Sequence, residues 1–281
     1  MKAAFTPMVP SNYTETVETG GELESYYLKN GEHEVAYFEK DIDEDFKKYE
    51  VYYPKDLIKE DTTLPVIVTV NGTGVKASKY KTQFKHFASW GFIVIGTEEE
   101  ESWDGVAAES SLAFLLEENE NSESIFYGKI DVNNIGIIGH SQGGAGVFNA
   151  ITNMEHSNLY KTAISLSPTN EEMAVSLKWS YDVTKINCPI MLLAGTKGDF
   201  EMNMVIPTEA MYELYNKISA PKLMARRKGM EHGQMLYSAD GYNTAWFMWH
   251  LQEDENAAKA FKDNGEIYTN ELYQEQKSDS L

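Results

Sequence analysis

The stretch that decides the fold is Ile135–Gly144, IGIIGHSQGG, in which an apolar run leads directly into a serine flanked by glycines. The run Ile135–Ile138 predicts a buried strand, and the Ala/Val/Phe pattern that follows the glycines predicts a helix. A G-x-S-x-G sequence at a strand–turn–helix junction is typical of a nucleophilic serine. Gly139 and Gly143 leave room for a sharp turn, which lifts the Ser141 hydroxyl above the end of the strand.

Similar apolar runs recur along the chain with helical segments between them. The runs are Val66–Val70, Phe92–Ile95, Ile135–Ile138, Ala163–Leu166 and Ile190–Ala194. The helical segments are Tyr80–Trp90, Val106–Glu118, Gly143–Met154 and Pro207–Ile218. Strands that are apolar on both faces and alternate with helices predict an α/β fold with a mostly parallel, doubly wound sheet. Before them, Glu34–Asp41 and Phe46–Tyr53 alternate aromatic or β-branched residues with charges, which predicts an antiparallel strand pair.

The C-terminal part predicts further elements of the same domain. Lys222–Ala225 is a strand candidate, and Tyr242–Leu251 is a Trp/Phe-rich helix that we expect to cover the sheet. A short helix is expected at Asn256–Phe261. Since no repeat or composition break divides the chain, we expect one domain over residues 21–265. Residues 1–20 are expected to form a flexible tail and residues 266–281 a loose one.

Composition excludes several classes of function. The 281 residues are 42% hydrophobic and 24% charged, which is typical of a globular protein, and the net charge of −20 argues against nucleic acid or an anionic membrane as a partner. The single cysteine, Cys188, excludes an internal disulfide and a Cys/His metal cluster. Met1–Pro10 has no apolar core of a signal peptide and no run is long enough to span a membrane, so we expect a cytoplasmic protein, or a secreted one if a leader has been removed. The oligomeric state is left open.

A serine nucleophile needs a base, and His232 is the best placed of six histidines. It lies in Gly229–Gly233, a loop after the last strand candidate, and an open α/β sheet places its site on loops beyond the strand ends. His33, His86, His156 and His250 fall within predicted hairpin or helical regions, and the His140 side chain is expected to diverge from that of its neighbour Ser141 on the tight turn.

The base in turn needs an acid that orients the imidazole and stabilises its charged form. Two aspartates lie between the serine and the histidine: Asp182 precedes the strand Ile190–Ala194, at the wrong end of the sheet, whereas Asp199 follows it. We therefore expect Asp199 to be the acid, with Glu201 as the fallback.

Two backbone N–H groups are candidates for stabilising an oxyanion. The N–H of Gln142 lies at a helix N-terminus, where partial positive charge gathers. The second donor is expected from the turn Asn71–Gly74, NGTG, after the first central strand, and Thr73 is the candidate.

These motifs resemble the α/β-hydrolase superfamily, and more narrowly the branch of dienelactone-hydrolase-like and cutinase-like, PET-hydrolase-like serine esterases. The resemblance covers roughly 49–261. It rests on the Val70–Thr73 turn, Gly91–Ile95, the serine motif, Ser167-Pro168, Gly195–Asp199, Glu231–Gly233 and the C-terminal pattern from Trp246 to Phe261. It implies the α/β-hydrolase fold, no metal or organic cofactor, and hydrolysis of carboxylic esters through an acyl-enzyme, with small or medium neutral esters as substrates.

The chain departs from secreted polyesterases at three points. It has Thr73 where they carry an aromatic residue, Thr169 and Asn170 where they tend to carry a tryptophan, and no second cysteine for their C-terminal disulfide. These departures point away from a polyester as the natural substrate. Dienelactone hydrolases use a cysteine nucleophile, so Ser141 points away from their chemistry as well.

Access and substrate charge can also be predicted. Only 19 residues, Thr169–Asn187, separate two strands where many lipases insert a cap, so we expect no cap domain and an open cleft. The run Glu98–Glu101 follows a strand at the expected active-site end and favours neutral or cationic esters over anionic ones. Two alternatives remain: an acyltransferase with the same triad, and a non-catalytic ligand-binding homologue.

Overall fold

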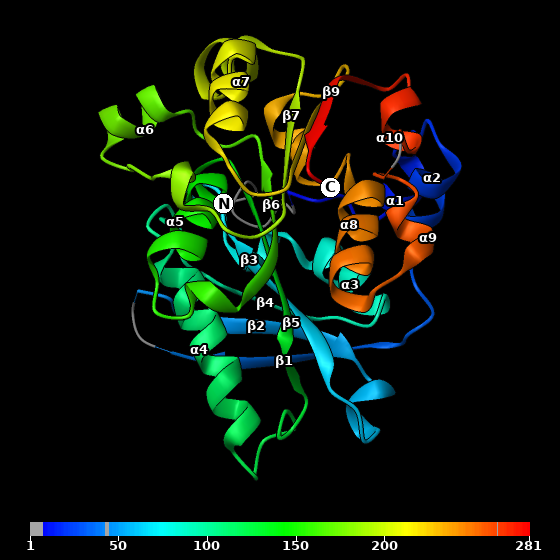
Figure 1. Ribbon diagram of the computed structural model, residues 1–281. Helices are drawn as coiled ribbons and strands as arrows, with labels where there is room; N and C mark the ends of the chain where they lie inside the picture. The colour runs from blue at the N-terminus through cyan, green and yellow to red at the C-terminus, as the bar shows by residue number, and fades with distance from the viewer. Residues whose placement is uncertain (1–7, 43–44, 263) are drawn as a thin grey trace.

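The computed structural model describes residues 8–281 except 43, 44 and 263, and shows one nine-stranded sheet with helices on both faces (Figure 1). The strand order is β1-β2-β4-β3-β5-β6-β7-β8-β9. The strands are β1 Val35–Asp41, β2 Lys48–Pro54, β3 Leu64–Val70, β4 Ile93–Thr97, β5 Ile130–His140, β6 Tyr160–Leu166, β7 Ile190–Gly195, β8 Lys222–Arg227 and β9 Tyr273–Asp279. The parallel pairs run from β4 through β8, so the prediction of a doubly wound α/β fold is confirmed.

The predicted N-terminal strand pair is confirmed as β1 and β2, which pair antiparallel and join the sheet through β4. The strands β4 and β7 are buried along their whole length, because helices cover both faces of the sheet. The helices are α1 Tyr13–Thr16, α2 Glu22–Leu28, α3 Lys81–Ser89, α4 Val106–Glu120, α5 Gln142–Asn153, α6 Glu171–Leu177, α7 Thr208–Lys217, α8 Asp240–Gln252, α9 Glu255–Ala258 and α10 Glu266–Thr269.

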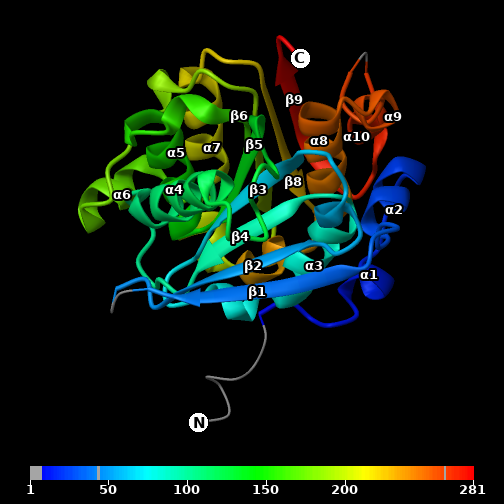
Figure 2. The ribbon, with the colours of Figure 1, turned by 90° about the horizontal axis from the view of Figure 1, so that it is seen from below.

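Two apolar cores flank the sheet, one on each face. The view from below shows α4 to α7 on one side and α1 to α3 with α8 to α10 on the other (Figure 2). Leu112 and Phe148 belong to the first core, and Phe87 and Trp246 to the second. Trp246 is fully buried on α8 and its indole donates to Thr162 Oγ1 at 2.7 Å, so this aromatic helix covers the sheet as predicted.

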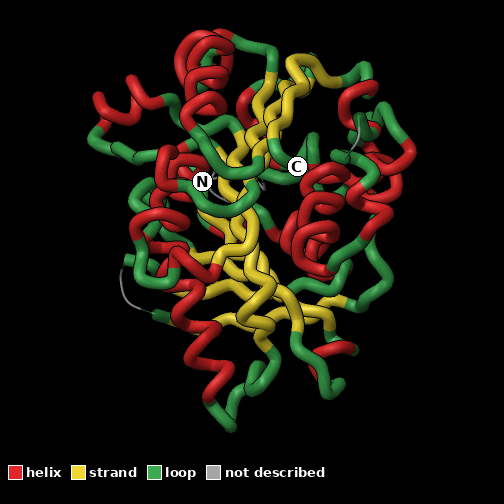
Figure 3. Tube along the Cα trace, in the orientation of Figure 1, coloured by secondary structure: helices red, strands yellow, loops and turns green. Residues whose placement is uncertain are grey.

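The two predicted tails differ from what the structure shows. Residues 1–7 lie outside the described residues, whereas α1 buries Tyr13 completely. The expected loose tail 266–281 instead contains the helix α10 and the strand β9 (Figure 3). β9 pairs antiparallel with β8. Polar sequence misled the prediction here, because an edge strand with one face exposed needs few apolar residues. Among the described residues, no helix has the length and apolar content needed to cross a membrane.

The sequence predicts no cap domain in the segment 169–187. This segment forms the short helix α6 and a single 3-10 turn at Val183–Lys185. Its N-terminus is fixed by Asn170, whose side chain accepts the Met173 N–H at 3.0 Å. The backbone of Asn170 also bonds to Val205 at 2.8 Å, which holds α6 against the segment that follows β7.

Candidate active site

Ser141 lies on a strained turn between β5 and α5. Its backbone angles are φ 61° and ψ −120°, outside the regions that L-residues prefer. A side chain on Gly139 would come within 2.3 Å of the Gly143 carbonyl oxygen, and one on Gly143 within 2.2 Å of the Val70 carbonyl oxygen. Both glycines are therefore required, since any Cβ would force the strand and helix apart. The turn leaves Ser141 partly exposed at the carboxyl end of the sheet.

Glu201 and His232 form the closest acid–imidazole pair at this site. His232 Nδ1 lies 2.6 Å from Glu201 Oε2, so the imidazole donates from Nδ1 and its Nε2 is left as the acceptor. The other carboxylate oxygen accepts the Ser167 hydroxyl and the Gly195 N–H, each at 2.6 Å. Burial raises the pKa of Glu201, but the hydrogen bonds from His232, Ser167 and Gly195 outweigh it and hold that pKa below its ordinary value.

A rare local structure carries Glu201. Residues Phe200–Val205 form a π-helix, labelled η6, whose wider turn closes with the Ile206 N–H bonded to the Glu201 carbonyl at 3.0 Å. The buried Arg226 guanidinium donates to the carbonyls of Gly195 at 2.9 Å and Ile206 at 2.9 and 3.0 Å. One side chain thus fixes the backbone on both sides of η6, which sets the position of the carboxylate.

The structure does not bring Asp199 to the imidazole, which corrects the sequence expectation. The Asp199 side chain is exposed and accepts a hydrogen bond from Asn203 at 3.2 Å, whereas Glu201 is fully buried beneath His232. The loop position was correct, but the π-helix turns the residue two places further on towards the site. A π-helix is rare and is not signalled by hydrophobic periodicity, so the sequence offered only the fallback.

His140 joins the serine turn to the histidine loop. Its Nε2 donates to the His232 carbonyl at 2.8 Å, and the two rings lie 4.5 Å apart. Burial and then the nearby His232 lower the pKa of His140 to about 3, so this imidazole is neutral at physiological pH. The sequence predicts no role for His140 at the site, because neighbouring side chains diverge on a tight turn. In the structure His140 links two loops that are 92 positions apart.

No hydrogen bond between the Ser141 hydroxyl and His232 occurs in the described part of the chain. Such contacts are often long without substrate and tighten only in a complex. The hydrogen bond from His140, the neighbour of Ser141, to the His232 carbonyl nevertheless places Ser141 and His232 at the same edge of the sheet.

The turn predicted to supply an oxyanion donor lies beside Ser141. A Cβ added to Gly72 would lie 3.7 Å from Ser141 Cβ. The N–H groups of Gly72, Gly74 and Val75 are bonded to the Tyr80 hydroxyl, the Glu100 carbonyl and the Gly72 carbonyl. Within the residues that the structure describes, the exposed Thr73 N–H has no such partner. The Gln142 N–H begins α5 and has no acceptor within the helix, so both predicted donors are available.

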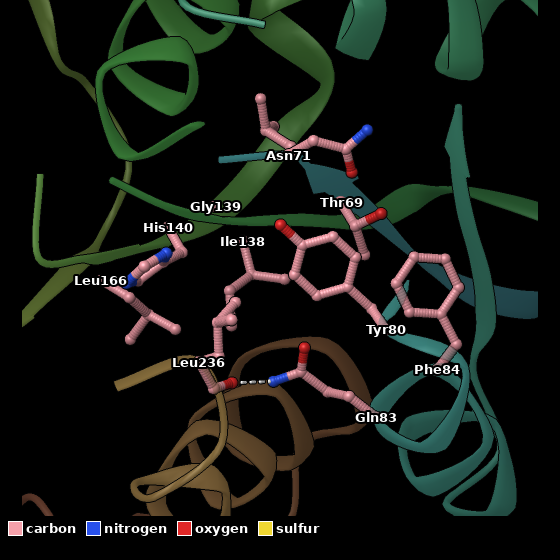
Figure 4. Close-up of a pocket in the computed structure, with 11 residues that line it drawn as sticks. Thr69, Asn71, Tyr80, Gln83, Phe84, Ile138, Gly139, His140, Leu166 and Leu236 are labelled. Carbon is pink, nitrogen blue, oxygen red and sulfur yellow. Dashed lines mark hydrogen bonds between the residues drawn. The ribbon is translucent and has the colours of Figure 1, made fainter. Parts of the chain in front are cut away.

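The inner wall of the site encloses a small cavity of about 20 Å³ behind His140 (Figure 4). The Tyr80 ring, Leu166 and Leu236 line it, and Gln83 closes one side by bonding to the Leu236 carbonyl. Space for about one water cannot hold an ester. The cavity therefore belongs to the scaffold behind the site and not to the substrate cleft.

The acidic run Glu98–Glu101 is less free than its sequence suggests. Glu98 is buried and accepts the N–H and hydroxyl of Ser78 at 2.8 and 2.9 Å. Glu100 lies 3.3 Å from Lys76 and 3.9 Å from Lys47. Much of the run thus holds its own loop in place, and the preference for neutral or cationic esters stays a prediction. Over the described residues, no group of three or more His, Cys, Asp and Glu is arranged to bind a metal ion.

Comparison with known proteins agrees with this geometry. No curated protein matches the chain. A family model described as PETase, PET hydrolase-like, matches residues 20–270, which include Ser141, Glu201 and His232. The match covers most of the chain and extends from before α2 to after α10. Together with the nine-stranded sheet, it shows that the chain belongs to the PET hydrolase-like family of α/β-hydrolases.

Proposed function

We propose that the protein is a serine carboxylic ester hydrolase that works through an acyl-enzyme on small or medium esters. The observation that carries this proposal is the 2.6 Å hydrogen bond between His232 and the buried Glu201, beside the strained Ser141 turn. A buried carboxylate that holds an imidazole in one tautomer serves to make the other nitrogen a base. Membership of the PET hydrolase-like family supports an ester as the substrate.

In the proposed mechanism, Ser141 Oγ attacks the ester carbonyl and its proton passes to His232 Nε2. The N–H groups of Thr73 and Gln142 stabilise the resulting oxyanion, and Glu201 balances the charge on the imidazolium. Collapse breaks the bond to the alcohol, which leaves with the proton from His232. Water then attacks the acyl group, gives its proton to the same nitrogen, and collapse releases the acid and restores the Ser141 hydroxyl.

An open site fits small and medium esters, with a polyester as a further candidate. Thr73 and Gly74 are exposed, and the region expected to lack a cap contributes only α6. The turn offers no aromatic side chain at Thr73 for stacking on an aromatic polyester.

The test is hydrolysis of p-nitrophenyl esters from acetate to laurate, combined with labelling by a fluorophosphonate. We expect labelling and turnover in the wild type and neither in Ser141→Ala. Wild-type protein that neither hydrolyses an ester nor takes the label would overturn the proposal and favour a ligand-binding homologue. If products in the presence of an alcohol are mainly new esters even in excess water, the enzyme is an acyltransferase instead.

A further inference from the structure

A second hollow, larger than the cavity behind His140, lies on the opposite face of the sheet, between α6 and α7 and next to η6 (Figure 2). Figure 1 labels these two helices. Its volume is about 610 Å³. We call it the α6–α7 groove. Its apolar lining is Met173, Leu177, Met204, Pro207 and Ala210. Leu177 is 40% exposed and Met204 54% exposed, which is unusual for large apolar side chains gathered around one hollow and is typical of a binding surface.

The groove adjoins the candidate active site through η6. Phe200, at the start of η6, is 49% exposed and its ring meets the His232 ring edge-on at 4.9 Å. Met204 lies four residues further along, close to one turn of this helix, so the two side chains share a side of it. At the opposite wall, Asn170 lines the groove, and the N–H of the preceding Thr169 bonds to the Ser141 carbonyl at 3.4 Å. Exposed apolar side chains therefore stand near both ends of η6, Phe200 against the imidazole and Met204 in the groove.

The charged residues that line the groove are all glutamates: Glu172 on α6, and Glu209 and Glu213 one turn apart on α7. All three are exposed, and in the described part of the chain none of them forms an ion pair. Lys217, on the same helix, is bound to Glu171 instead. An apolar hollow with an anionic rim is complementary to an apolar chain with a positive end.

We propose that the α6–α7 groove binds the far end of an extended ester substrate whose apolar chain ends in a positive charge, such as a quaternary ammonium group. The proposal rests on the esterase function proposed above and adds its substrate class. The reacting carbonyl sits at Ser141, the chain passes Phe200 and Met204, and the cation lies among the glutamates. Two alternatives are separated by the following experiment. If the groove binds neutral chains, the cationic and neutral esters react equally fast; if the chain does not enter the groove, changes to the groove leave both rates unaltered.

The experiment compares two p-nitrophenyl esters of the same shape. One carries an octanoyl chain ending in trimethylammonium, and the other the same chain ending in tert-butyl. The charge is fixed, so no titration complicates the comparison. At low salt we expect kcat/KM to be about tenfold higher for the cationic ester, since three exposed charge pairs contribute modestly each, and the ratio should approach one at high salt. p-Nitrophenyl acetate, too short to enter the groove, reports on the catalytic site alone.

The variant Glu172→Gln/Glu209→Gln/Glu213→Gln should abolish the preference and leave acetate hydrolysis unchanged. Its matched control is Glu117→Gln/Glu120→Gln/Glu123→Gln, which changes the net charge equally near the end of α4, far from the groove (Figure 1). The control should keep the preference. Filling the groove with Ala210→Trp should slow both long esters and spare acetate.

The outcomes separate this inference from the proposed function. Equal rates for the two esters in the wild type, or loss of the preference in the α4 control as well, would overturn the inference while acetate hydrolysis still supports an esterase. If p-nitrophenyl acetate is not hydrolysed, the proposed function fails. A binding measurement then tests the groove independently of catalysis. Calorimetric titration with octyltrimethylammonium below its micelle concentration should show binding that the groove triple variant loses. Equal binding by that variant, or no binding by the wild type, contradicts the groove.

Discussion

The glutamates Glu24 and Glu201 are both fully buried, but their carboxylates have different partners. Glu24 Oε2 accepts the Gly20 N–H and the Asn270 amide, each at 2.8 Å. Its Oε1 accepts the Tyr273 hydroxyl at 2.9 Å and lies 3.4 Å from an Arg227 guanidinium nitrogen. Glu201 is held by shorter hydrogen bonds, each 2.6 Å long, and one of its three partners is an imidazole.

The difference between the two partners predicts a different role for each carboxylate. An arginine keeps its charge at any physiological pH, so the ion pair of Glu24 with Arg227 is a fixed tie between α2 and β8. The partner of Glu201 is an imidazole, which can donate at one nitrogen and accept at the other, and the His232 side chain is 14% exposed. Burial of a carboxylate therefore does not mark function by itself; the partner at the end of its hydrogen bonds does. The two regions should accordingly respond to mutation in opposite ways.

The largest expected effect is loss of catalysis without loss of stability. His232→Ala and Ser141→Ala should each lower kcat by about 10⁴–10⁶, and the double variant should be no worse, because triad members act as a unit. The midpoint of urea unfolding should change little for Ser141→Ala. If Ser141→Ala turned over substrate nearly as fast as the wild type, the region of Ser141, Glu201 and His232 would not be the catalytic one.

The next effect distinguishes the two acids of the site. Glu201→Gln presents an amide to His232 Nδ1 and favours the wrong tautomer, so we expect kcat/KM to fall by about 10³–10⁴. Asp199→Asn is the matched control, since it removes an exposed carboxylate two residues away, and it should remain close to the wild type. If Asp199→Asn is the damaging change, the acid predicted from sequence is correct and the observed geometry is not the active one.

Glu24→Gln should show the reverse pattern. Removing one partner leaves the buried Arg227 charge without its carboxylate, and such a change costs about 3–5 kcal/mol of unfolding free energy. Kcat of the protein that remains folded should be unaffected. The measurement is urea unfolding together with p-nitrophenyl acetate kinetics on the same preparation, and a fall in kcat without a fall in stability would erase the contrast between the two glutamates.

The smallest expected effect is on how the unfolding free energy falls at acid pH, and it depends on His140. The pKa of His140 is about 3 in the folded protein, below its ordinary value of 6.5, so below pH 6.5 the unfolded chain binds a proton that the folded state does not. Stability from this group is therefore complete above pH 6.5 and is lost as the pH falls towards 3. His140→Gln keeps an N–H donor without titrating.

Between pH 7 and pH 5 its unfolding free energy should fall less than that of the wild type, by about 1–2 kcal/mol. Urea unfolding at the two pH values checks this. An equal fall in both proteins would mean that other groups account for the acid sensitivity.

Much of the fold could be predicted from sequence because parallel strands leave a clear signal. Runs such as Ile190–Ala194 are apolar on both faces, and Gly139 and Gly143 reveal where the turn must be tight. The candidate residues Ser141 and His232 follow from the same logic, since both stand just past a strand end.

The missed features depend on contacts between distant segments. β9 is polar and is fixed by pairing with β8 and by the Tyr273 bond to Glu24, neither of which a local pattern contains. The choice between Asp199 and Glu201 depended on the π-helix, which Arg226 holds in place from another strand. Local sequence indicates which loop carries the candidate acid, and tertiary contacts decide which carboxylate of that loop reaches His232.

The position of β9 also has a consequence for how the chain folds during synthesis. β8 leaves the ribosome about 50 residues before its partner, as the bounds Lys222–Arg227 and Tyr273–Asp279 show. Until then its outer edge presents unpaired backbone groups, and an open edge is a template for pairing with another nascent chain. Closure of that edge is thus a late event in the biogenesis of the protein, and crowded translation of one message exposes the unpaired edge of β8 to co-aggregation.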